Sequence, residues 1–439
     1  MHEANPARKG GGAVSLARRP ARTKYNLPMP FDDDAIIAGA GAAGLMAAIR
    51  AAERGRRVLL LEKGKKPGVK ILMSGGTRCN ITHDCDARGI VEAFGPNGKF
   101  LHSALAHLGP RETVAFFNGE GVATKVEDTG KIFPVSDRAL DVLDALLKRV
   151  ARSGATLAIT EPVKDIELHP DGGFRVYTPA RTLTAERVLV TTGGKSYPGC
   201  GTTGDGYTIA QKFGHTIVPT KPALVPLTVQ PEWIRELQGI TLPDVGLRVL
   251  PPEGKPLSQR RGSMLFAHFG LSGPAPLDVS RAVSGHAEPR TLTLEADFLP
   301  TVPEPAFDTF LQAESLASGK KQLAGVLSDK LPRRLADQLL ALCGMPLDRK
   351  AAALSKVDRA KLVAAVKRTR LPLKGTLGFE KAEVTAGGVS LDEVDSRTMQ
   401  SKRQPGLYFA GEVLDLDGWI GGYNFQSAWS TGWLAGREL

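Results

Sequence analysis

Three glycines, Gly39, Gly41 and Gly44, follow the apolar run AIIA at the spacing G-x-G-x-x-G. In this pattern the first glycine permits a tight turn, the second lets the backbone approach a pyrophosphate, and the third lets a helix pack closely on a strand. Glu62 lies eighteen residues beyond Gly44 and ends a second apolar run. A carboxylate there accepts hydrogen bonds from ribose hydroxyls and repels a 2′-phosphate. These residues predict a dinucleotide site, and by themselves they leave NAD and FAD both open.

The elements that must position these residues can be predicted from the surrounding segment. Residues 35–38 form an apolar, strand-like run, and the alanine-rich stretch 42–54 favours a helix that ends at Gly55. A second apolar strand follows over 56–62. Strand, glycine turn, helix and strand stand in the order of a parallel βαβ unit, whose helix N-terminus offers free N–H groups to an anion.

Composition limits the class of protein. Hydrophobic residues make up 42% of the 439 residues, and no apolar run approaches the ~18 residues of a membrane span. The four cysteines form no CxxC pair and no cluster at metal-ligand spacing, so we expect no metal site and a place in the reducing cytoplasm. The net charge of +11 is spread along the chain without interleaved aromatics, which argues against a nucleic-acid partner. Residues 1–30 carry six Lys or Arg against one Glu, which predicts a disordered basic tail.

The rest of the chain alternates between glycine-rich and regular segments. We expect a glycine- and lysine-rich loop over 63–83, and an amphipathic helix over 138–152. That helix would carry Leu140, Leu143, Leu147 and Val150 on one face. A second G-x-G-x-x-G at 199–204 is not interpreted as another nucleotide site, because KSYP separates it from the preceding strand and Leu224 stands where an acid would be needed.

Several ordered motifs carry a family resemblance. They are AGAGAAGLMAA, KILMSGGTRCNIT, GKIFPVS, TTGGKSYPGCGTTGDGYTIAQKFGH, LFAHFGLSGPA and GLYFAGEVLDLDG followed by GGYNFQ. The chain from about Ala35 to Gly436 resembles the BaiN-type, or aminoacetone-oxidase-type, NAD(P)/FAD-dependent flavoprotein oxidoreductases. The resemblance implies non-covalent FAD as the cofactor. Ala267, Cys200 and the Trp-Ile pair in DGWIGG depart from the usual family pattern, which leaves the substrate open.

The resemblance also implies a fold and a division of the chain. We expect an α/β protein with a doubly wound, Rossmann-like FAD-binding domain built from residues 31–200 and 375–439. An inserted substrate domain, 201–374, would lie between them, with a β-rich part at 221–300 and a helical part at 305–369. Ligands bind at the topological switch point of such sheets, so the active site would lie between the flavin and the insert.

Cofactor-binding residues are carried over from the family motifs. The glycine turn would hold the pyrophosphate, Glu62 the adenosine ribose, Val163 the adenine, and the FAGE motif the ribityl chain. The last helix would turn its N-terminus toward the flavin ring, where it favours the negative charge of a reduced flavin. The full expected set is Gly39, Gly41, Ala42, Ala43, Gly44, Glu62, Lys63, Lys70, Arg78, Asn80, Val163, Gly193, Gly411, Glu412, Gly422, Tyr423 and Asn424.

Since a flavin carries the hard chemistry, the protein must position a substrate and move a proton. His268 is the best general-acid candidate by residue type, with a structural histidine as the alternative. Arg78 is a candidate for stabilising developing charge, with a structural ion pair as the alternative. Tyr423 is a candidate proton donor, or it fills space at the start of the helix.

Three functions remain open. The first is a reductase that passes hydride to an activated alkene or enone-type small molecule, with NAD(P)H as donor. The second is an oxidase or dehydrogenase of an amine or alcohol. The third is an RNA-associated flavoprotein, suggested by the pI near 9.5 and by distant kinship with tRNA-modifying flavoproteins. We expect a small-molecule substrate, and the sequence leaves the oligomeric state open.

Overall fold

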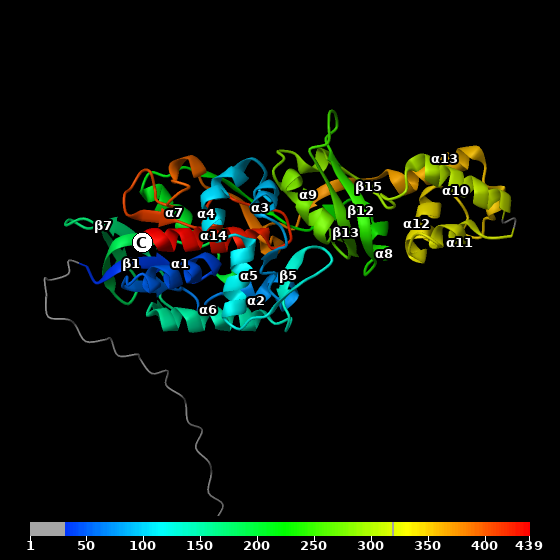
Figure 1. The fold of residues 1–439 in the computed structure, drawn as a ribbon. Helices are drawn as coiled ribbons and strands as arrows, with labels where there is room; N and C mark the ends of the chain where they lie inside the picture. The colour runs from blue at the N-terminus through cyan, green and yellow to red at the C-terminus, as the bar shows by residue number, and fades with distance from the viewer. Residues whose placement is uncertain (1–30, 318–319) are drawn as a thin grey trace, which may run out of the picture.

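The computed structural model describes residues 31–317 and 320–439 and places them in two packed bodies joined side by side (Figure 1). The basic tail expected at 1–30 lies outside the described residues. One hydrophobic core draws on residues between Ala35 and Ala210 and again between Val389 and Leu439. The other draws on residues between Leu227 and Leu373. The second core therefore interrupts the first along the chain.

The first body is built on a seven-stranded sheet. Its strands are β1 (Asp33–Ala38), β2 (Val58–Leu61), β6 (Thr156–Ala158), β7 (Asp165–Leu168), β8 (Phe174–Tyr177), β9 (Thr182–Val190) and β18 (Leu407–Phe409). The order is β6-β2-β1-β9-β8-β7, and β18 also pairs with β9. Strands β6, β2, β1, β9 and β18 are parallel, whereas β7 and β8 add an antiparallel hairpin. This doubly wound α/β arrangement confirms the predicted fold class.

The predicted βαβ unit is confirmed as β1, helix α1 (Ala42–Glu53) and β2. Ala35 of β1 pairs with Val58 of β2, so the two strands run parallel in register. Gly39 has φ +108°, and a Cβ there would lie 2.6 Å from the Thr191 carbonyl oxygen. A Cβ on Gly44 would lie 1.9 Å from the Gly39 oxygen. Close approach of α1 to the strands therefore requires glycine at both positions.

Helices cover the sheet and a small three-stranded sheet lies beside it. The helices are α2 (Val69–Thr77), α3 (Ala87–Ala93), α4 (His102–His107), α5 (Pro110–Gly119), α6 (Ala139–Ser153), α7 (Asp205–Lys212) and α14 (Tyr423–Glu438). The small sheet has the order β3-β5-β4, with β3 at Thr82–His83, β4 at Thr124–Val126 and β5 at Lys131–Pro134. The loop expected over 63–83 is wrong in part, because the apolar run around Ile71 forms α2 and buries that side chain.

Helix α14 packs directly on α1, as the blue and red ribbons of Figure 1 show. A Cβ on Gly432 would lie 2.2 Å from the Ala43 oxygen, and one on Gly436 would lie 2.5 Å from the Ala47 oxygen. Both contacts advance by four residues on each helix, so the two helices run parallel. The two glycines allow the helix backbones to touch.

The second body is a closed barrel with a helical extension. Its strands, in barrel order, are β11 (Leu227–Val229), β14 (Gly270–Ser272), β13 (Ser258–Ala267), β12 (Thr241–Leu250), β15 (Thr293–Asp297) and β16 (Thr369–Thr376). Two further helices are α8 (Trp233–Glu236) and α9 (Pro274–Ser284). The extension, between β15 and β16, contains α10 (Glu304–Ala317), α11 (Leu323–Ser328), α12 (Arg333–Leu342) and α13 (Lys356–Lys367). The barrel is therefore completed by β16, a strand that follows the helical extension in the sequence.

The chain passes between the bodies through a two-stranded antiparallel sheet of β10 (Ile217–Ala223) and β17 (Val384–Val389). Helix α7 lies within 201–374, the range predicted for the inserted domain. Its residues Tyr207, Ile209 and Ala210 nevertheless pack in the core of the first body. In Figure 1 the barrel stands between the first body and the helical extension. No helix in the two described ranges has both the length and the apolar character that crossing a bilayer requires.

Candidate flavin-binding and catalytic site

The glycine turn offers open space where a pyrophosphate would lie. Gly41 is the N-cap of α1, and a Cβ built on it meets nothing within 4 Å. Glu62, at the end of β2, accepts hydrogen bonds from the backbone N–H of Ala40 at 3.0 Å and of Gly64 at 2.7 Å. Because a carboxylate has about four acceptor sites, it can still accept from a ribose hydroxyl. The turn, the helix N-terminus and the acid thus fit the adenosine half of a dinucleotide.

Two other expected residues lie near this end of the site. The Glu161 N–H donates to the Glu62 carbonyl at 2.8 Å, and the half-buried Val163 follows two residues later. Lys63 instead forms an ion pair with Asp205 at 2.6 Å, at the first residue of α7. This ion pair joins the end of β2 to α7.

The parallel packing of α1 and α14 sets the length of the site. Gly432, which touches Ala43 of α1, lies ten residues after the start of α14 at Gly422. Ala43 lies two residues after the α1 N-cap, Gly41, so at 1.5 Å per residue the N-terminus of α14 lies about 12 Å ahead of that of α1. Gly411 is next to the same point, since its Cβ would lie 2.9 Å from the Ala43 Cβ. The two staggered helix N-termini would suit FAD lying extended along them.

An unpaired buried acceptor marks the flavin end. Asn80 is 8% exposed, and its Oδ1 has no hydrogen-bond partner. A Cβ on Gly422 would lie 2.8 Å from this atom and 2.5 Å from the Thr82 oxygen, so the backbone of Gly422 lies against it. An acceptor left unpaired in a buried site fits a ligand N–H. The residues present therefore fit the cofactor that the motifs predicted.

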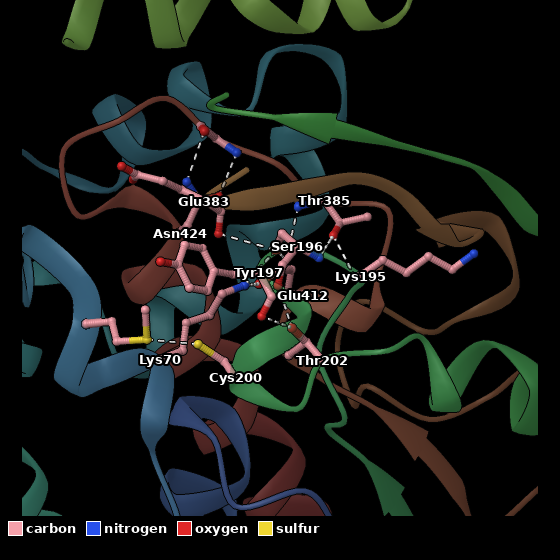
Figure 2. A network of polar contacts seen from close by, with 12 residues as sticks. Lys70, Lys195, Ser196, Tyr197, Cys200, Thr202, Glu383, Thr385, Glu412 and Asn424 are labelled. Atoms are coloured by element: carbon pink, nitrogen blue, oxygen red, sulfur yellow. Dashed lines mark hydrogen bonds and ion pairs between the residues drawn. The ribbon is translucent and has the colours of Figure 1, made fainter. Parts of the chain in front are cut away.

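Glu412 is the centre of a polar network between β17 and α2 (Figure 2). Its carboxylate accepts from Lys70 Nζ at 2.6 Å, from Ser196 Oγ at 2.7 Å and from the Thr385 N–H at 3.0 Å. Lys70 and Glu412, both predicted at the cofactor, form an ion pair in the structure. Ser196 and Thr385 were not predicted, because only the fold brings them to this point. Gly193, with φ +75°, lies in the same loop as Ser196.

Comparison with known proteins identifies the family. A family model described as the HI0933-like protein Rossmann domain matches residues 33–438. The chain belongs to the HI0933-like family. It is an FAD-dependent oxidoreductase, as its motifs predicted.

Three relatives align with nearly the whole of this HI0933-like chain. The ribosomal RNA dihydrouridine synthase of Escherichia coli (strain K12) is 37% identical over 409 residues, covering 92% of this chain and 98% of that protein. The protein with the same name in Haemophilus influenzae is 34% identical, covering 92% and 98%. The 3-dehydro-bile acid delta(4,6)-reductase of Clostridium scindens is also 34% identical, covering 91% and 97%.

Tyr423, the first residue of α14 in this HI0933-like protein, is stacked on an imidazole. The centroids of the Tyr423 and His83 rings are 4.6 Å apart, with 21° between their planes. The His83 Nδ1 lies 3.0 Å from the Gly421 carbonyl oxygen, which holds the imidazole against the loop before the helix. Burial raises the pKa of the Tyr423 phenol to about 12. The phenol is therefore protonated at neutral pH and can donate a proton. His83 was not among the residues predicted for this site.

Asn424 holds the loop that precedes α14. Its Oδ1 accepts from the Gly418 N–H at 2.8 Å, and its Nδ2 donates to the Gly418 carbonyl at 3.0 Å. These two hydrogen bonds fix the path of residues 418–422 as they approach the start of α14.

The other two expected catalytic residues have different surroundings. Arg78 forms an ion pair with Glu127 at 2.6 Å and lies over the Phe133 ring at 3.9 Å, and the hydrogen bond that it donates to Glu127 raises its pKa. These contacts correspond to the ion-pair alternative. His268 is exposed in the turn between β13 and β14, where its ring contacts Phe269 edge-on at 4.9 Å.

Buried carboxylates at the junction of the two bodies were missed. Asp278 of α9 accepts from the Ile420 N–H at 2.8 Å, and burial raises its pKa to about 6. Burial also raises the pKa of Asp417 to about 7, an effect that nearby Arg281 opposes. Raised acid pKa values in a cleft are typical of functional sites. No local sequence pattern indicated them, because α9 and the loop at 417–420 are far apart in the chain.

Proposed function

We propose that this protein is a flavin-dependent reductase of an activated carbon–carbon double bond. Bound FAD, once reduced, supplies a hydride to one carbon of the bond. The protein then supplies a proton to the other carbon, and positions the bond at the N-terminal end of α14. A reductase of this kind needs a proton donor, whereas an amine or alcohol oxidase needs a base.

The observation that carries the proposal is the protonated phenol of Tyr423 at the start of α14. Like an ordinary tyrosine, the phenol keeps its proton near neutral pH, and burial raises its pKa further, to about 12. Stacking on His83 holds the ring in place, and the α14 N-terminus favours negative charge on the flavin side. A protonated phenol held in place supports a step that consumes a proton, as reduction of the double bond does.

We propose further that the substrate is a uracil base in ribosomal RNA. The C5=C6 bond of uracil is conjugated to a carbonyl, so it is an activated double bond of the required type. The support is the 37% and 34% identity, over about nine-tenths of the chain, to two proteins named ribosomal RNA dihydrouridine synthase. This proposal departs from the sequence-based expectation of a small-molecule substrate without a nucleic-acid partner, and takes up the RNA-associated alternative.

A small-molecule enone is the second candidate substrate. It is supported by the 34% identity to a protein named 3-dehydro-bile acid delta(4,6)-reductase. NAD(P)H is the proposed electron donor for either substrate.

Anaerobic stopped-flow spectroscopy of the holoprotein tests the proposal. NADPH or NADH should bleach the flavin, and unmodified ribosomal RNA should then restore its colour faster than air does. Mass spectrometry of the RNA should show a uridine that has gained two hydrogens. Restoration of colour by a steroidal enone but not by RNA would favour the second candidate. Restoration by air alone would contradict a reductase.

A further inference from the structure

A cavity of about 610 Å³ lies where α9 of the barrel faces the first body. One wall is formed by Asp278 and Arg281 of α9, and the opposite wall by Asp417 and Trp419. In Figure 1 α9 lies on the side of the barrel that faces α3. The volume is within the ~300–1,000 Å³ range of small-ligand pockets.

The cavity adjoins the proposed proton donor. The rings of Trp419 and Tyr423 meet edge-on, with centroids 6.2 Å apart. The Ile420 N–H donates to Asp278, so the loop between Trp419 and the start of α14 is tied to the barrel. A polymer that places one residue at Tyr423 would therefore place a neighbouring residue beside Trp419.

The polar groups of the cavity walls are not fully paired. Asp417 is 7% exposed, and its Oδ1 makes no hydrogen bond although Arg281 Nη1 is 3.1 Å away. The Nε of Arg260, a third wall residue, is also buried without a hydrogen-bond partner. Buried polar groups without partners are uncommon, and a ligand with both donors and acceptors would satisfy them.

An aromatic and cationic stack completes the cavity. The guanidinium of Arg260 lies over the Trp419 ring, 3.9 Å from its centroid. Nucleobases stack on aromatic rings and on arginine planes in single-stranded RNA recognition. Arg281 and His286 also line this cavity. The Arg281 side chain is half-exposed although it pairs with Asp417, so both residues can contact a phosphate.

We propose that this cavity binds a nucleotide next to the target uridine in the RNA strand. Its base stacks on the Arg260–Trp419 pair, its N–H groups donate to the buried Asp417 carboxylate, and its phosphate lies by Arg281. This inference rests on the proposed function. The fused hydrocarbon rings of a steroid offer no donor to the Asp417 carboxylate, whereas a nucleobase carries both N–H donors for it and acceptors for the Arg260 N–H.

The test compares holoprotein variants in binding a short, fluorescein-labelled, single-stranded RNA that contains uridine. Trp419→Leu should weaken binding ~10- to 100-fold, the range that the loss of one stacked base predicts. Trp419→Phe should restore most of it. Arg281→Gln should lower the slope of log affinity against log salt by about one. Arg333→Gln on α12, an exposed arginine on the helical extension, is the matched control. The visible flavin spectrum checks that each variant is folded.

Activity assays separate this inference from the proposed function. With RNA as oxidant of the reduced flavin, Trp419→Leu should raise KM and leave kcat within ~3-fold, because the stacked nucleotide contributes binding rather than chemistry. If wild type is re-oxidised by RNA and both Trp419 variants bind RNA as wild type does, the cavity assignment is wrong and the function stands. If wild-type protein neither binds nor is re-oxidised by RNA, the proposed function itself fails. A rise in KM for a steroidal enone in Trp419→Leu would make the cavity a small-molecule pocket and overturn the inference.

Discussion

The Tyr423 ring lies on the His83 imidazole, with ring centroids 4.6 Å apart and 21° between the planes. The two residues are far apart in the sequence: His83 belongs to the small sheet, and Tyr423 begins the last helix. Their contact positions a buried phenol at the N-terminus of α14, which is expected to face the flavin.

Tyr423→Phe should slow re-oxidation of the reduced flavin by substrate ~10²-fold or more, since general acids contribute about that much. Bleaching by NAD(P)H should be unchanged, because that half-reaction needs no proton from the phenol. Tyr177→Phe on β8 is the matched control. Equal substrate rates for Tyr423→Phe and wild type, measured by stopped flow, would exclude the phenol as donor.

His268→Gln separates the two candidate donors. His268 is exposed on the barrel turn, and Tyr423 is buried beside the α14 N-terminus. We therefore expect His268→Gln to leave the rate constant for substrate reduction within ~3-fold of wild type, well below the ~10²-fold loss of a general acid. A 10²-fold loss in this variant, with normal flavin absorbance, would transfer the role to the imidazole.

The pH profile gives an independent measure. An unperturbed tyrosine loses its proton near pH 10, and burial raises the pKa of Tyr423 to about 12. A raised pKa keeps the acid form present to higher pH, so the reduction rate constant should stay flat from neutral pH to about 10. A histidine donor would instead cause a fall above pH ~6.5. Single-turnover rates across this range distinguish the two.

Glu412→Gln tests the network between α2 and β17. The carboxylate accepts from Lys70, Ser196 and the Thr385 N–H, and hydrogen bonds to charged groups contribute ~1.5–3 kcal/mol each. We expect a loss of ~2–3 kcal/mol in the free energy of unfolding in urea, and faster release of FAD on dilution. Glu380→Gln, at an exposed position, should change neither. Unchanged urea midpoints in Glu412→Gln would show that the network contributes little.

Gly432→Ala tests the contact between α1 and α14. A Cβ at this position would lie 2.2 Å from the Ala43 oxygen, so the helices must separate. Overpacking of this kind costs ~1–3 kcal/mol, and displacement of α14 should also weaken FAD binding. Gly119→Ala, at an exposed helical glycine with nothing within 4 Å of the new Cβ, should keep or slightly raise stability. Fluorescence titration with FAD and urea unfolding measure both effects.

Local patterns predicted the parts of the fold that short segments determine. The glycine spacing and apolar periods located β1, α1, β2 and α14, and the helix expected at 138–152 is α6, Ala139–Ser153. The face predicted for α6 was wrong in part. Leu140 is 44% exposed, while Val142 and Leu146 are buried, because α6 packs against both α1 and α2 and so buries a broader stripe.

Features that depend on distant pairing were not predictable. Strand β16 closes the barrel only by pairing with β15 and β11, which lie before the helical extension. Asp278 meets Ile420 across 142 residues of sequence, and His83 meets Tyr423 across most of the chain. Each cofactor motif is a contiguous stretch and could therefore be recognised in the sequence. The substrate side is assembled from α9, the small sheet and the loop before α14, which are far apart in the sequence.

The contact between α1 and α14 also has a consequence for biogenesis. Helix α1 is translated before the barrel and its helical extension, and its partner α14 only after them. The cleft for the coenzyme therefore stays open until α14 has been made, so the complete coenzyme site cannot form before then. A barrel that folds independently in the interval would keep the two halves of the nucleotide-binding unit within reach of each other.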